Sequence, residues 1–192
     1  MTHVLSREER VAVAHLKRGG IGVVPTDTIY GIVGRALSQE AVARLYVVRR
    51  RDRTKPFIVL IASLDDLALF DIALSPQQVD VLRTVWAAQS VRKTSVIITC
   101  PQKKWHYLHR GTQAIAFRLV HTPQLRALIA AVGPLVAPSA NLQNLPPAQT
   151  AQQARAYFGN HVDFIIDGGV IIAPQSRIMR IDAQGHFTCV RD

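Results

Sequence analysis

Cysteine is scarce in this chain of 192 residues, and long apolar runs are missing. Cys100 and Cys189 lie far apart, without a second thiol or paired histidines beside them, so neither a disulfide framework nor a zinc site is indicated. We expect both thiols to be apolar filling in the core. No apolar run reaches the roughly 18 residues that a membrane-spanning helix needs, so no membrane contact is expected.

Acidic residues are also in short supply. Lysine and arginine number 23 against 13 aspartates and glutamates, which gives a formal charge of +10. The densest basic cluster is RRRDRTK, residues Arg49 to Lys55. Such a balance favours polyanionic partners, RNA or nucleotide phosphates, although a generally basic surface is the simpler alternative.

The common signatures of nucleotide-binding enzymes and hydrolases are missing as well. The chain contains no GxxxxGK[ST], no GxGxxG and no GxSxG, so the usual NTPase, dinucleotide and serine-hydrolase interpretations have no motif to rest on. The first twenty residues carry charges where a signal peptide needs an unbroken apolar segment, so we expect a cytoplasmic protein.

What the sequence does contain is enough apolar material for one packed unit. Hydrophobic residues make up 48% of the chain, and a chain of this length buries about 70% of the surface that its unfolded form exposes. No linker or repeat divides it. The sequence therefore predicts a single domain over residues 1–192 and excludes a disordered chain.

Apolar segments of strand and helix type alternate along the chain with short connections. Ser6 and Glu9 form the capping-box pattern of a first helix, which the pair Gly19-Gly20 ends. The predicted helices cover residues 7–18, 39–50, 63–70, 75–86, 122–133 and 148–159. The predicted strands cover residues 21–25, 56–62, 95–100, 114–120, 134–138, 162–167, 178–182 and 187–191. This alternation predicts an α/β fold, a twisted open mixed sheet flanked by helices.

Three segments carry residues suited to binding chemistry. In VVPTDTIYGIVG, Pro25 removes a ladder donor, so the chain is expected to leave the sheet and present hydroxyls and amides of residues 26–28 to a ligand. In YVVRRRDRTKPF, converging cations favour phosphate binding. In APSANLQNLPPAQT, Ser139 and Asn141 offer a hydroxyl and an amide. Taken singly, each has a simpler interpretation, as a capped turn, a solvated basic loop and a polar turn.

In this order and spacing, the segments PTDTIYG, the basic loop ending in KP, AFRLV, PLVAPSAN, PPAQT and DGG resemble the YrdC/TsaC family of threonylcarbamoyl-AMP synthases. The resemblance covers nearly the whole chain. It implies a YrdC-like fold with a concave basic face.

The resemblance also implies a nucleotidyltransferase reaction. L-Threonine, bicarbonate and ATP would give threonylcarbamoyl-adenylate and pyrophosphate, and the product would supply the threonylcarbamoyladenosine modification of tRNA through a downstream transfer complex. Mg²⁺ is expected to arrive with ATP and to neutralise charge on the leaving group.

The site residues that the resemblance implies fall into two sets. The set for ATP is Arg49, Arg51, Lys55, Ser139, Asn141 and Ser176, with Arg49 and Arg51 in the catalytic role of holding the triphosphate. The set for threonine is Thr28, Tyr30 and Arg118, the last suited to the carboxylate. No metal ligand is implied.

The chain departs from the family pattern in several places. Arg49 stands where lysine is usual, and Gln143-Asn144 replace a Ser-Gly pair. The Trp-Pro-Gly-Pro segment appears as VWAAQSVRKTSV, with only Trp86 kept, and Arg177 stands where a small hydroxyl residue is common. These changes leave open a second function, a non-catalytic RNA-binding relative that retains the basic face.

The segment KKWHYLHR mixes cations with Trp105 and Tyr107, a combination that suits stacking on RNA but fits a turn with packed aromatics equally well. His106 and His109 lack a third ligand, so we interpret them as surface or RNA-facing residues rather than metal ligands.

Overall fold

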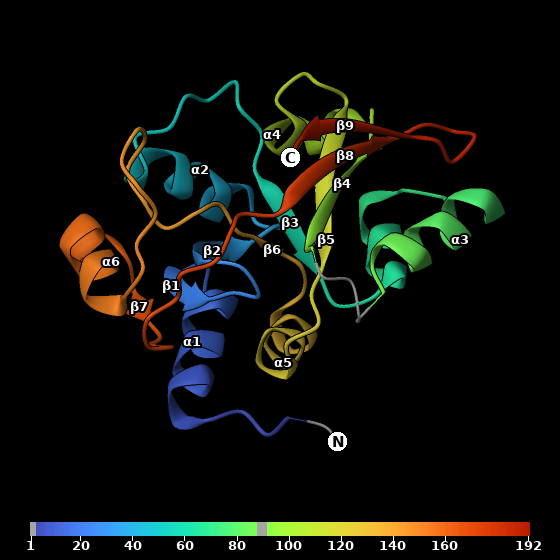
Figure 1. The fold of residues 1–192 in the computed structure, drawn as a ribbon. Coiled ribbons are helices and arrows are strands. Elements are labelled where there is room, and N and C mark those ends of the chain that lie inside the picture. Colours follow the sequence, from blue (N-terminus) through green and yellow to red (C-terminus); the bar gives the residue numbers. More distant parts are fainter. Residues whose placement is uncertain (1–2, 88–91) are drawn as a thin grey trace.

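The computed structural model describes residues 3–87 and 92–192, whose strands form one nine-stranded mixed sheet (Figure 1). The strands are β1 (Ile21–Pro25), β2 (Tyr30–Arg35), β3 (Ile58–Ile61), β4 (Thr94–Thr99), β5 (Ala114–Leu119), β6 (Leu135–Val136), β7 (Phe164–Ile165), β8 (Arg177–Ile181) and β9 (Phe187–Arg191). Their order across the sheet is β7-β1-β2-β6-β3-β5-β4-β8-β9. The predicted α/β fold with an open mixed sheet is confirmed.

Helices connect the strands and pack on the sheet. The α-helices are α1 (Arg7–Lys17), α2 (Gln39–Val48), α3 (Pro76–Val85), α4 (His106–His109), α5 (Pro123–Val132) and α6 (Ala151–Phe158). Three short 3-10 helices are η1 (Leu64–Phe70), η2 (Lys103–Trp105) and η3 (Gly159–His161). None of the helices in the described part of the chain has the length and apolar character needed to cross a bilayer.

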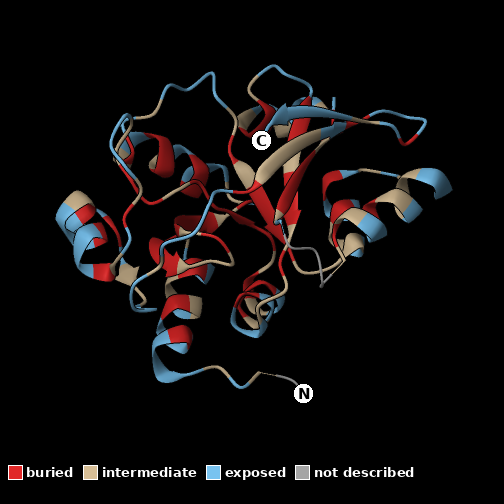
Figure 2. Ribbon diagram, in the orientation of Figure 1, coloured by how far each residue is buried: buried red, intermediate tan, exposed pale blue. Residues whose placement is uncertain are grey.

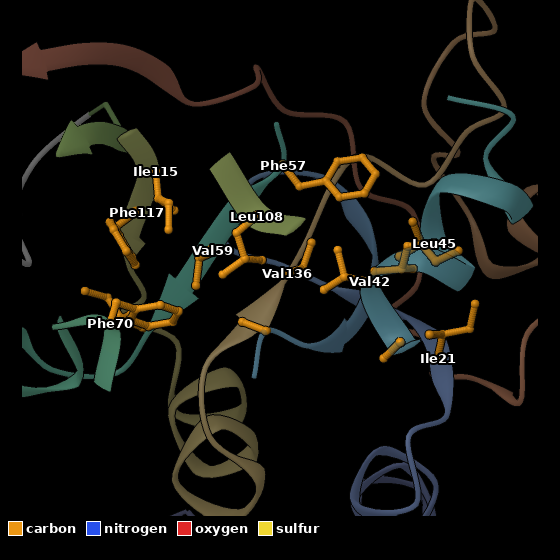
Figure 3. Close-up of a cluster of buried hydrophobic side chains, with 14 of the residues drawn as sticks. Ile21, Val42, Leu45, Phe57, Val59, Phe70, Leu108, Ile115, Phe117 and Val136 are labelled. Atoms are coloured by element: carbon orange, nitrogen blue, oxygen red, sulfur yellow. The ribbon is translucent and has the colours of Figure 1, made fainter. Parts of the chain in front are cut away.

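Side chains alternate across the sheet and divide the core between its two faces. Val24 and Val33 pack with α1 and α5, whereas Val23 and Ile32, one residue away, pack in the larger cluster with α2. Figure 3 shows this larger cluster, which includes Leu45 from α2, Phe57 from the segment before β3 and Phe117 from β5. In Figure 2 the central strands are almost wholly buried, while α3 and α6 expose their outer faces.

The local signals at helix ends are confirmed where they are strongest. The Ser6 hydroxyl accepts the Glu9 backbone N–H at 3.2 Å, and the Glu9 carboxylate accepts the Ser6 N–H at 2.7 Å, which completes the predicted capping box of α1. Ser75 caps α3 in the same way, with Pro76 in the first turn. The backbone at Gly19 has φ +82°, a conformation that suits the glycine following the helix.

The structure differs from the sequence prediction after Pro25, in residues 63–70 and in residues 101–112. The chain does leave the sheet after Pro25, but it returns at once as β2, which pairs antiparallel with β1 from Tyr30 opposite Pro25 onward. Two glycines in β2 hide its strand character. A side chain at Gly31 would be tight, because a Cβ there would lie 3.0 Å from Cγ2 of Thr26. The predicted α-helix over residues 63–70 is the 3-10 helix η1.

The segment 101–112 is folded as η2 and α4 rather than as a loop. Trp105 packs against Phe70 with ring centroids 5.3 Å apart, and the Tyr107 hydroxyl donates to the Ala36 carbonyl at 2.9 Å. The aromatics therefore take part in the core. The interpretation of His109 as a surface residue is wrong, because it is 3% exposed and its Nδ1 accepts the Gly111 N–H at 3.1 Å; His106 is exposed.

Trp86 is buried, and its indole N–H donates to the Thr94 carbonyl at 2.9 Å. Part of the altered segment that follows it, residues 88–91, lies outside the described residues.

Candidate active site

A pocket of about 320 Å³ opens where the ends of several strands meet. It is lined by the chain between β1 and β2, the segment before β3, the turn after β6, and the side chain of Arg118 from β5. All nine site residues predicted from the sequence line it: Thr28, Tyr30, Arg49, Arg51, Lys55, Arg118, Ser139, Asn141 and Ser176. The structure thus brings both sets together in one cavity, while the individual roles remain predictions.

One end of the pocket is formed by the basic loop and rests on two aromatic rings. The guanidinium carbons of Arg51 and Arg49 lie 5.4 and 5.9 Å from the centroid of the Phe57 ring. Phe57 in turn stacks on Tyr46 with centroids 4.0 Å apart. The Tyr46 hydroxyl donates to the Lys55 carbonyl at 2.9 Å. Cation–π contact and this hydrogen bond together fix where the loop presents its charges.

Arg49 is buried beneath this loop rather than extended into solvent. Its Nε donates to the Asn141 carbonyl at 3.0 Å, and its Nη2 donates to Asn141 Oδ1 at 2.8 Å and to Ser139 Oγ at 3.3 Å. Burial, followed by the nearby charge of Arg51, lowers the pKa of Arg49 to about 10. The group remains a cation at neutral pH.

The Asn141 side chain is fully used by the protein. Its Oδ1 accepts from Arg49 and from the Ser139 hydroxyl, the latter at 2.6 Å, and its Nδ2 donates to the carbonyls of Leu142 at 2.8 Å and Leu145 at 2.7 Å. An amide offers two donors and two acceptor positions, and all four are occupied. Asn141 therefore shapes the turn, and the Ser139 hydroxyl keeps one acceptor position for a ligand.

The other end of the pocket holds Thr28 and Arg118. The hydroxyls of Thr28 and Thr26 lie 3.1 Å apart, and Thr26 Oγ1 donates to the Ile29 carbonyl at 2.6 Å, which fixes the turn between β1 and β2. Behind it, Asp27 Oδ1 lies 2.9 Å from Nη2 of Arg118, and both side chains are almost completely buried. Burial lowers the pKa of Arg118, and Asp27 acts to raise it.

Tyr30 ties a distant segment to the pocket. Its hydroxyl accepts the Gly168 N–H at 2.8 Å and donates to the Gly169 carbonyl, also at 2.8 Å. These contacts hold residues 166–176, the segment between β7 and β8 that brings Gln175 and Ser176 to the pocket. The Tyr30 ring is fully buried, and its hydroxyl anchors residues 166–176 through these hydrogen bonds.

Ser176 lies directly before β8, the strand that pairs with β4. Its hydroxyl lies 2.9 Å from that of Ser95, and its carbonyl accepts from Nη2 of Arg191 at 2.7 Å. Burial lowers the pKa of Arg191, which lines the pocket as a further cation. Five of the lining side chains described are cationic and none is a carboxylate, so the pocket suits an anion.

Sequence reasoning missed several of these residues. Asp27, Phe57, Gln175 and Arg191 form part of the site or touch its groups, and three of them stand in no pattern that distinguishes them from a turn or strand residue. Only Asp27 carried a signal, as an acid placed between two threonines in PTDTIYG. Gln143, noted as a departure, also lines the pocket.

The family model Sua5/YciO/YrdC, described as telomere recombination, matches residues 14–192. The chain belongs to the Sua5/YciO/YrdC family. A curated relative from Chromohalobacter salexigens, named threonylcarbamoyl-AMP synthase, is 32% identical over 161 residues, which cover 83% of this chain and 84% of the relative.

Two solved structures place the fold within the Sua5/YciO/YrdC family. Sua5 of Pyrococcus abyssi complexed with L-threonine superposes with a TM-score of 0.78 at 26% identity, covering 90% of this chain and 50% of that protein. The chain therefore spans about half the length of that relative. YciO of Escherichia coli has a TM-score of 0.80 at 19% identity, covering 98% and 91% of the two chains, and it supports the fold alone.

Proposed function

We propose that this pocket joins L-threonine, bicarbonate and ATP into L-threonylcarbamoyladenylate with release of pyrophosphate, and that the product supplies the threonylcarbamoyladenosine modification of tRNA through a transfer complex. The observation that carries the proposal is that three cations of the basic loop, Arg49, Arg51 and Lys55, line the same cavity as the buried Arg118. The three loop cations suit a triphosphate, and Arg118 suits an amino-acid carboxylate. The threonine bound to P. abyssi Sua5 and the synthase name of the C. salexigens relative support the choice of substrate and reaction.

The chemistry follows from this placement. The threonine amine adds to the carbon of bicarbonate with loss of water, which gives a carbamate. A carbamate oxygen then attacks the α-phosphorus of ATP, the bond from that phosphorus to the bridging oxygen breaks, and pyrophosphate leaves with the electron pair. Arg51 and Lys55 would stabilise the charge that gathers on the leaving group, and Arg118 would hold the threonine carboxylate. No protein nucleophile is required.

The described lining residues do not fit a magnesium site formed by the protein. Mg²⁺ prefers carboxylate and carbonyl oxygens, and the lining side chains include no aspartate or glutamate. Mg²⁺ is therefore proposed to enter on the phosphates of ATP, and no step of the reaction is derived through it.

The test is incubation of the purified protein with labelled bicarbonate, threonine, ATP and Mg²⁺, with pyrophosphate release as the measurement. We expect release that depends on both threonine and bicarbonate. Release that depends on neither, at high protein concentration, would contradict the proposal. Tight tRNA binding with a steep salt dependence and no turnover would instead identify the RNA-binding alternative.

A further inference from the structure

Two residues that depart from the family pattern, Arg49 and Gln143, meet at one junction in the structure. The basic loop and the turn after β6 are 90 residues apart in the chain, as the contact of Arg49 with Ser139 shows. Arg49 reaches across with three hydrogen bonds to the Ser139–Asn141 turn. Gln143 reaches back: its Oε1 accepts the Asp52 N–H at 2.7 Å, and its own N–H donates to the Arg49 carbonyl at 3.0 Å.

We propose that Arg49 and Gln143 form a latch between residues 49–52 and residues 139–145 that sets the nucleotide end of the pocket before ATP binds. The inference rests on the proposed function for the identity of the nucleotide, and it assigns Gln143 as a positioning residue. The latch is defined by the five hydrogen bonds above.

The chemistry of the two side chains explains why these residue types form it. A guanidinium presents its donors in a planar fork, so Arg49 can bond a carbonyl and a side-chain oxygen of Asn141 at the same time. A lysine ammonium at the same position is a point charge on a flexible chain and lacks that fork. Gln143 is long enough to reach the Asp52 amide, which lies in an exposed part of the loop.

The latch acts on charges that otherwise repel each other. Arg49 and Arg51 stand two residues apart over the same Phe57 ring, and the charge of Arg51 contributes to the lowered pKa of Arg49. The hydrogen bonds with Asn141 and Gln143 fix the loop, and they hold these two cations close together before an anion neutralises them. Because a preordered site loses less conformational freedom on binding, the latch is expected to raise the affinity for ATP.

The test uses Gln143→Met, which keeps the length of the side chain and removes its acceptor. The matched control is Gln152→Met, at an exposed position of α6 away from the pocket. Hydrogen exchange of residues 49–57 in the nucleotide-free protein, the Kd for ATP, and the separate KM values for ATP and threonine are measured for both. Thermal unfolding checks that both variants are folded.

For Gln143→Met we expect faster exchange at the Asp52 amide, ATP binding weakened about five- to tenfold, and the KM for threonine changed less than about twofold. Arg49→Lys is expected to shift exchange and ATP binding in the same direction. Weakened ATP binding with unchanged exchange would assign Gln143 to direct contact with the nucleotide and overturn the latch. Faster exchange with unchanged ATP affinity would overturn its role in ordering the site. Exchange and Kd report on the latch even if pyrophosphate release fails to depend on threonine.

Discussion

Asp27 and Arg118 form an ion pair of 2.9 Å whose side chains are 2% and 5% exposed. Neither carboxylate oxygen of Asp27 accepts a hydrogen bond from the residues that the structure describes, so Arg118 is the group that compensates its buried charge. The pair also fixes the guanidinium of Arg118 where it lines the pocket.

Asp27→Asn is expected to lower the free energy of unfolding by about 3 kcal/mol, because it leaves the buried Arg118 cation uncompensated. Urea unfolding measures this change. The double variant Asp27→Asn/Arg118→Met should lose less stability than the sum of the two single changes. Strict additivity would show that the two charges do not interact in solution.

Arg51→Ala should weaken ATP binding at least tenfold and leave threonine binding nearly unchanged, because Arg51 lines the basic end of the pocket beside Phe57. Calorimetric titration with each ligand gives the two affinities. The control is Arg53→Ala, which removes the same charge from an exposed position of the same loop. Equal loss of both ligands in Arg51→Ala would indicate a folding defect instead.

Tyr30→Phe should lower the free energy of unfolding by about 1–3 kcal/mol and speed hydrogen exchange at Gly168 and Gly169. It removes the hydrogen bonds of the hydroxyl with these two glycines and the longer one, 3.4 Å, to Asp167 Oδ1. The comparison is Tyr157→Phe, which removes one hydrogen bond to the Pro146 carbonyl near the surface. It should lower the free energy of unfolding by less than Tyr30→Phe does. Unchanged exchange in residues 166–176 would show that Tyr30 does not anchor this segment.

Acid should destabilise the fold in part through Asp163. Burial acts to raise its pKa, but hydrogen bonds from Arg44, at 2.6 Å, and from the Ile21 N–H, at 2.7 Å, outweigh burial, and the net pKa lies below the usual 3.8. A carboxyl whose pKa falls on folding adds stability above its unfolded pKa and loses it as the pH drops through the folded value. Asp163→Asn should therefore lower the free energy of unfolding at pH 7 by about 1–2 kcal/mol. In this variant the free energy of unfolding should also fall less steeply as the pH drops below 4. Asp65→Asn, at an exposed position, is the control for removing a carboxylate, and urea unfolding as a function of pH compares the two variants.

The two thiols should differ in reactivity. Burial, with a contribution from Asp71, raises the pKa of Cys100 to about 11, whereas Cys189 is exposed on the edge strand β9. The expectation that both thiols fill the core is therefore wrong for Cys189. Since the thiolate is the reactive form, alkylation of the native protein at pH 8 should modify Cys189 and spare Cys100. Mass spectrometry of the peptides gives the answer, and rapid labelling of both sites would contradict the buried position of Cys100.

The sequence predicted most of the fold because its helix ends carry local chemistry. Ser6, Glu9, Ser75 and Pro76 act within a few residues of themselves, so their effect is readable without a structure. β2 was missed for the opposite reason. The space at its glycines is limited by neighbours from elsewhere in the chain, such as Ala41 and Ile21 around Gly34, and no local sequence pattern indicates that limit.

The candidate site shows the same division. The members of the pocket were predicted from motif order, and the structure brings them together. How they are held was not predictable, because the contacts cross large intervals of sequence: Arg49 to Asn141 spans 92 residues and Tyr30 to Gly168 spans 138. Arg49, which was predicted as a phosphate ligand, thus forms hydrogen bonds within the protein to a turn that is distant in the sequence.

Strands β8 and β9, which bring Ile178 and Arg191 to the pocket, follow all the other described strands in chain order. β8 pairs with β4, near the middle of the sequence, and β9 pairs with β8. During synthesis on the ribosome, residues 21 to 165 are already available when these two strands emerge. The cavity can therefore be completed only after residues 176–191 have been synthesised, and a nascent chain stopped before residue 176 would carry the basic loop without Ser176, Ile178 and Arg191.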